Sequence, residues 1–136
     1  MGADQVAAIR PALAELEADE RTLVPDAPAR FFARFTVPEG DSPWVEIYLE
    51  REAFINLWHP SDDDPLERLS GAGVRPLPGT RIASSYKPAC TLAARRGPSG
   101  DLARFVDALF DRLYGCGNDY PLDVELLRFP EQAGQQ

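Results

Sequence analysis

Residue types that build metal and catalytic sites are scarce in this chain of 136 residues, which has two cysteines and one histidine. A single histidine excludes a metal site made from several histidines of one chain. Cys90 and Cys116 do not have the spacing of a zinc site. In a reducing compartment we expect both to be free thiols that pack as small hydrophobic residues.

Long apolar runs and an excess of positive charge are also missing. No apolar run approaches the ~20 residues that cross a bilayer, and the segment MGADQVAAIRPALAELEADE does not resemble a signal peptide. The chain has 14 lysines and arginines against 22 aspartates and glutamates, a formal net charge of −8. Because an acidic surface repels phosphate groups, we expect no binding to nucleic acid or membranes. We expect a cytoplasmic protein whose partner is basic or apolar.

What the sequence does contain is enough apolar material for one core, since 44% of its residues are hydrophobic. The length is that of one domain. We predict a single domain over residues 1–130 and a disordered tail over residues 131–136.

Three helices are predicted. Residues 101–113 carry an apolar stripe at helical spacing, and Gly115 and Gly117 supply a left-handed exit. Residues 4–20 form a first helix, whose stable part we expect to start at Pro11. A short middle helix covers residues 61–70, with Asp64 as its N-cap. The stripe consists of Leu102, Phe105, Val106, Leu109, Phe110 and Leu113.

Alternating apolar and polar residues predict five or six strands. The expected strands cover residues 29–37, 44–50, 53–58, 81–87 and 90–95, with residues 122–127 as a sixth strand at an edge. Strands in a block with a helix at each end favour an α+β fold built on an antiparallel sheet.

The hairpin of residues 44–58 has a predictable register. Its two aliphatic sets must share the core face, because a slip of one residue would expose one of them. A loop over residues 50–52 then pairs Leu49 with Ala53. The aliphatic sets are Val45, Ile47 and Leu49, and Ala53, Ile55 and Leu57. The opposite face carries Trp44, Tyr48, Phe54 and Trp58, with Trp44 opposite Trp58 and Tyr48 opposite Phe54.

Trp44, Tyr48, Phe54 and Trp58 are therefore the candidate partner-binding residues. An exposed aromatic patch of this size is typical of an interface. The alternative is that the first helix covers these side chains, and the sequence leaves both arrangements open.

The polar motifs favour structural roles. His59, at a strand end, is best interpreted as a hydrogen-bonding structural residue. A triad of His59 and Asp62 with Ser84 or Ser85 lacks a nucleophile elbow. The consecutive aspartates 62–64 fit helix capping better than a calcium loop. We predict no catalytic residues, no cofactor and no metal site.

The order of the elements, together with several segments, resembles the type III secretion chaperone fold, and in particular its TY-Chap or YbjN-like branch. The segments are WVEIYLEREAFINLWHP, DPLERL after the third strand, and LARFVDALFDRLYG followed by DYPLDVEL. The similarity covers residues 29–127. It implies a secretion-chaperone-like fold and a homodimer that binds unfolded segments of protein partners without ATP. The middle helix, which makes much of the dimer contact in those chaperones, is short here.

Three functions follow as hypotheses. The first is a non-catalytic, chaperone-like module that binds an apolar or basic segment of a partner. The second is an immunity or regulatory protein that inhibits a basic partner such as a toxin. The third, a small enzyme, lacks support because no acid/base or metal constellation is present.

Overall fold

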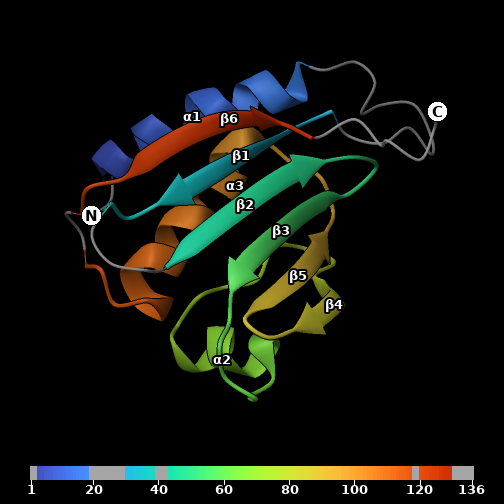
Figure 1. The fold of residues 1–136 in the computed structure, drawn as a ribbon, viewed down its shortest axis with the longest axis vertical. Coiled ribbons are helices and arrows are strands. Elements are labelled where there is room, and N and C mark those ends of the chain that lie inside the picture. The colour runs from blue at the N-terminus through green and yellow to red at the C-terminus, as the bar shows by residue number, and fades with distance from the viewer. Residues whose placement is uncertain (1–2, 19–29, 39–42, 118–119, 130–136) are drawn as a thin grey trace.

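The computed structural model describes residues 3–18, 30–38, 43–117 and 120–129. It has an α+β fold in which six strands form one antiparallel sheet with the order β4-β5-β3-β2-β1-β6 (Figure 1). The predicted sixth strand is confirmed as an edge strand. The elements are α1 (Ala3–Glu17), β1 (Phe31–Thr36), β2 (Trp44–Leu49), β3 (Ala53–Trp58), α2 (Pro65–Gly71), β4 (Arg81–Tyr86), β5 (Ala89–Ala94), α3 (Ser99–Ala108), η2 (Leu109–Leu113) and β6 (Asp123–Arg128).

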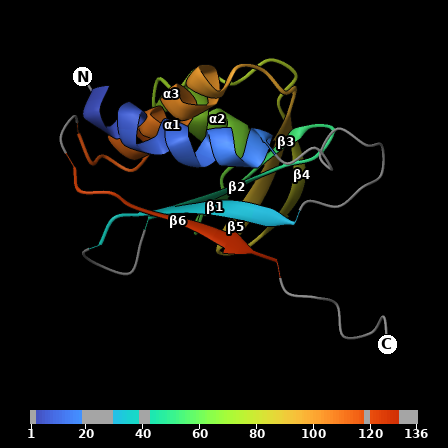
Figure 2. The ribbon, with the colours of Figure 1, turned by 90° about the horizontal axis from the view of Figure 1, so that it is seen from above.

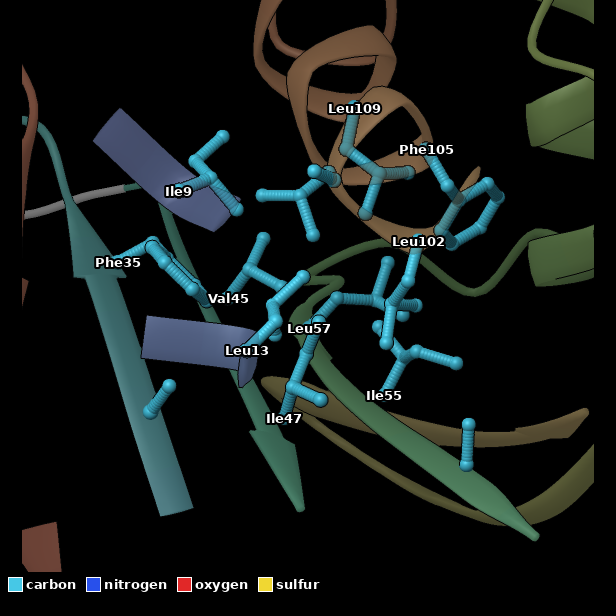
Figure 3. Packing of buried hydrophobic residues seen from close by; sticks show 14 of the residues in the cluster. Ile9, Leu13, Phe35, Val45, Ile47, Ile55, Leu57, Leu102, Phe105 and Leu109 are labelled. Carbon is cyan, nitrogen blue, oxygen red and sulfur yellow. The ribbon is translucent and has the colours of Figure 1, made fainter. Parts of the chain in front are cut away.

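The molecule has two layers, with α1, α2 and α3 on the same side of the sheet (Figure 2). The apolar stripes of α1 and α3 meet the aliphatic sides of the strands in one core, where Ile9 and Leu13 lie beside Val45 and Ile47 (Figure 3). Burial of these side chains is the main stabilising contribution to the fold. We call the opposite side of the sheet, which no described helix covers, the reverse face.

The predicted register of the central hairpin is confirmed. Leu49 pairs with Ala53, Ile47 with Ile55 and Val45 with Leu57, and Tyr48 lies opposite Phe54. All six aliphatic side chains are buried, with exposed fractions of 3% or less. The loop closes through a hydrogen bond from Glu50 N to Glu52 O of 2.9 Å.

The apolar stripe of the long helix is also confirmed, since its residues from Leu102 to Phe110 are buried. The structure differs from the predicted regular α-helix in the last part of this segment. After Ala108 it widens into the π-helical turn η2, where Tyr114 N donates to Leu109 O at 2.9 Å. Gly115 and Gly117 then have φ angles of 72° and 82°, so the predicted left-handed exit is present.

The starts of two helices differ in part from their predictions. α1 begins at Ala3 and runs through Pro11, although proline removes a helix hydrogen bond. Pro11 is exposed, while Ile9 and Leu13 on either side of it are fully buried, so core packing stabilises the helix across the proline. α2 begins at Pro65 and not at residue 61, and the predicted N-cap at Asp64 is confirmed. The tail predicted for residues 131–136 lies outside the described residues.

We expect Asp64→Ala to destabilise the protein by about 1 kcal/mol, because the Asp64 side chain accepts a hydrogen bond of 2.9 Å from Leu66 N at the start of α2. Urea unfolding followed by circular dichroism measures this change. Asp62→Ala is the control, since Asp62 is exposed and forms a surface ion pair with Lys87. Equal losses of stability in the two variants would contradict a capping role.

Candidate functional site

The reverse face carries the side chains that the sequence marked as candidate partner-binding residues. The first helix does not cover them, because α1 packs on the aliphatic side of the sheet with α3 (Figure 2). Trp44, Tyr48, Phe54 and Trp58 are half-buried in the positions where the strand alternation places them. The alternative that the sequence left open, in which the first helix covers these side chains, is therefore wrong.

Four aromatic side chains form what we call the aromatic cluster: Phe32, Tyr48, Phe54 and Phe129. The rings of Tyr48 and Phe54 stack, with centroids 4.9 Å apart and planes 11° apart. Phe129 packs against Phe32 at 4.8 Å and edge-on against Tyr48 at 5.5 Å. Such stacked and edge-to-face contacts hold aromatic rings in fixed orientations. The cluster is therefore a preorganised apolar surface across β3, β2, β1 and the end of β6.

Sequence reasoning missed two members of this cluster. Phe32 is on the reverse face by the alternation of β1, where Ala33 and Phe35 face the core. Phe129 follows β6, and its backbone N–H donates to Arg30 O at 2.9 Å, which continues the pairing beyond the strand. Extending the alternation of residues 123–127 by two positions would have placed Phe129 on this face.

The two tryptophans lie outside the aromatic cluster. Trp44 pairs with Thr36 of β1, and Trp58 pairs with Ala89 of β5. The pairing of β2 with β3 stops at Val45 and Leu57, one residue before the two tryptophans would oppose each other. The Trp58 ring instead lies 5.9 Å from the Tyr114 ring, whose hydroxyl donates to Trp58 O at 2.6 Å.

A row of polar side chains crosses the middle of the reverse face, and we call it the polar row: Arg34, Glu46, Asn56 and Thr91. Arg34 Nε donates to Glu46 Oε2 at 2.9 Å, and Asn56 Nδ2 donates to Glu46 Oε1 at 3.1 Å. Thr91 Oγ1 donates to Asn56 Oδ1 at 3.1 Å. The bonds link four adjacent strands and fix the Glu46 carboxylate between the aromatic cluster and the tryptophans.

Negative charge dominates the β6 side of this face. Arg34 lies between two carboxylates, because Glu46 is its neighbour on β2 and Glu125 is its neighbour on β6. Asp123 and Glu125 are exposed. Burial, together with the nearby Glu50 carboxylate, raises the pKa of the Tyr48 hydroxyl, which stays neutral and available as a hydrogen-bond donor at physiological pH. The reverse face thus joins an aromatic surface to an acidic border.

The other candidate groups have structural surroundings. His59 is buried, and its Nε2 lies 2.7 Å from Asp63 O. Ser84 and Ser85 are exposed on β4. Cys90 is buried, and burial raises the pKa of its thiol to about 11, so it is a poor nucleophile. Among the described residues, no group of three or more histidine, cysteine, aspartate or glutamate side chains is arranged to hold a metal ion.

Comparisons with known proteins return nothing: no protein-family model, no curated protein and no solved structure matches the chain. In the part of the chain that the structure describes, no helix has both the length and the apolar character to cross a membrane.

Proposed function

We propose that this protein is a non-catalytic protein-binding module that binds an apolar, basic segment of a protein partner on its reverse face. The observation that carries the proposal is the aromatic cluster, which is held rigid by ring contacts on a sheet face free of described helices. Aromatic side chains in preorganised patches contribute much of the binding energy at protein interfaces. The proposal includes a chaperone-like role, a cytoplasmic location and a homodimer.

The charge of the molecule supports a basic partner. The chain has a formal net charge of −8, Glu46 borders the aromatic cluster, and Glu125 and Asp123 continue the acidic border along β6 away from the cluster. Complementary charge speeds association and excludes acidic competitors. A segment with apolar side chains against the cluster and arginine or lysine side chains toward these carboxylates would satisfy both parts of the face.

The binding test uses a fluorescent peptide rich in phenylalanine, leucine and arginine, and a matched peptide with glutamate in place of arginine. We expect the arginine peptide to bind more tightly in fluorescence anisotropy. Tyr48→Ser should weaken its binding by about tenfold or more, because Tyr48 contacts both Phe54 and Phe129 in the cluster.

The control variant is Ile82→Ser, which removes an exposed aliphatic side chain from β4 at the edge of the sheet. It should bind the arginine peptide as the unmodified protein does. Equal binding of the arginine and glutamate peptides, or equal weakening by Tyr48→Ser and Ile82→Ser, would refute the proposed site.

An immunity or regulatory protein that inhibits a basic partner is the second candidate, and the net charge of −8 favours it. Binding dominated by charge weakens steeply with salt, whereas binding dominated by apolar contact does not. A steep salt dependence that survives Tyr48→Ser would favour this second function over the first.

A further inference from the structure

A small cavity lies where β3, the loop before β4 and the start of α3 meet. Its volume is about 110 Å³. Ala53 and Leu102, which are buried, are its innermost residues, and a smaller recess that shares both continues toward Leu13 and Leu49. The remaining lining residues are Leu77, Pro78, Arg95, Arg96, Gly97, Pro98 and Asp101.

The outer wall of the cavity is a fixed turn of residues 77–80. Thr80 N donates to Leu77 O at 3.2 Å, and Gly79 has a φ of 72°. Proline second and glycine third in such a turn are typical of type II. Arg95 N donates to Pro78 O at 3.0 Å, which ties the turn to the end of β5. The wall is therefore held without a ligand.

Of the charged groups that line the cavity, Arg95 is the one without a partner among the described residues. Arg96 Nη1 donates to Glu50 O at 2.9 Å, and the Asp101 carboxylate pairs with Arg104. The exposed Arg95 guanidinium has neither a hydrogen bond nor an ion pair within the described part of the chain. An arginine that has no partner in the described ranges and lies at the mouth of an apolar cavity stands out in a chain with a net charge of −8.

We propose that this cavity binds a small carboxylate anion that carries an aliphatic group. An apolar cavity of ~150 Å³ accepts benzene, so the smaller volume here suits a branched end of about three carbons, with the rest of the chain reaching toward the mouth. The aliphatic group lies against Ala53, Leu77 and Leu102, and the carboxylate accepts charge-assisted hydrogen bonds from Arg95. This site is separate from the reverse face and does not depend on the proposed protein-binding function.

Isothermal titration calorimetry with isocaproate tests the site, and isohexanol, which has the same skeleton without the charge, is the matched ligand. We expect isocaproate to bind at least about tenfold more tightly than isohexanol, as a charge-assisted hydrogen bond requires. Arg95→Gln should remove this difference. Arg75→Gln, at an exposed position that does not line the cavity, should preserve it.

A cavity-filling variant, Leu77→Phe, tests the location, because Leu77 is on a loop that tolerates a larger side chain better than the core does. Isocaproate affinity should fall about tenfold while the unfolding temperature stays the same. Unchanged affinity in both Arg95→Gln and Leu77→Phe, or no saturable isocaproate binding at millimolar concentration, would overturn the proposal. Amide chemical shifts of Ala53 and Leu102 provide a second readout that needs no variant.

Discussion

Ile47→Asp should unfold the protein, whereas Tyr48→Asp at the next position should leave a cooperative fold. Ile47 is fully buried among the aliphatic side chains beneath the sheet. A carboxylate there loses its hydration without gaining a partner and also leaves a void, a combined loss of about 5 kcal/mol or more. That loss is comparable with the whole stability of a typical domain, about 5–15 kcal/mol.

At position 48 the same carboxylate lies on the reverse face, where the side chain is half-buried. The loss of ring contacts with Phe54 and Phe129 should cost about 1–2 kcal/mol. Circular dichroism and urea unfolding of the two variants measure the contrast. If both variants fold cooperatively, or if both are unfolded, the assignment of the two faces is contradicted.

Phe110→Ala should destabilise the protein by about 3–5 kcal/mol, the range for truncation of a fully buried phenylalanine. Phe110 has no exposed surface and lies in η2, where its ring centroid is 5.8 Å from that of Tyr114 and 5.5 Å from that of Tyr120. Tyr120 is in turn held by a hydrogen bond of 2.7 Å from its hydroxyl to Asp107 Oδ1. The truncation therefore leaves a void between η2 and the segment that leads into β6.

The measurement for Phe110→Ala is the free energy of urea unfolding, with Leu113→Ala as the control at a half-buried position of the same turn. We expect Leu113→Ala to lose much less stability, because part of its surface is already exposed to water. A loss below about 1 kcal/mol for Phe110→Ala would show that η2 is not packed as described.

The central hairpin was predictable because two constraints agree. A period of two places the aliphatic residues on one side of each strand, and the short loop at residues 50–52 allows only one register in which both sets are buried. The same reasoning found Tyr48 and Phe54. The N-cap at Asp64 was predictable because aspartate before proline has a clear local preference.

Other features depend on contacts between segments that are distant in the chain. Phe129 joins the aromatic cluster only because β6 pairs with β1, and no local pattern states that pairing. The passage of α1 through Pro11 depends on core contacts that outweigh the local preference of proline. The cavity beside Arg95 requires three separated segments to meet, so no local pattern predicts it.

The most direct test of the protein-binding account uses tryptophan fluorescence, since the chain has two tryptophans and the alternation of β2 places Trp44 on the reverse face. The variant Trp58→Phe leaves Trp44 as the single source of tryptophan fluorescence. Acrylamide quenching of Trp44 is then measured with and without the phenylalanine, leucine and arginine peptide at saturation. The account predicts that bound peptide protects Trp44 from acrylamide, because a basic segment on the cluster extends to Glu46, two positions from Trp44 on β2. Binding of the peptide with quenching unchanged would contradict it.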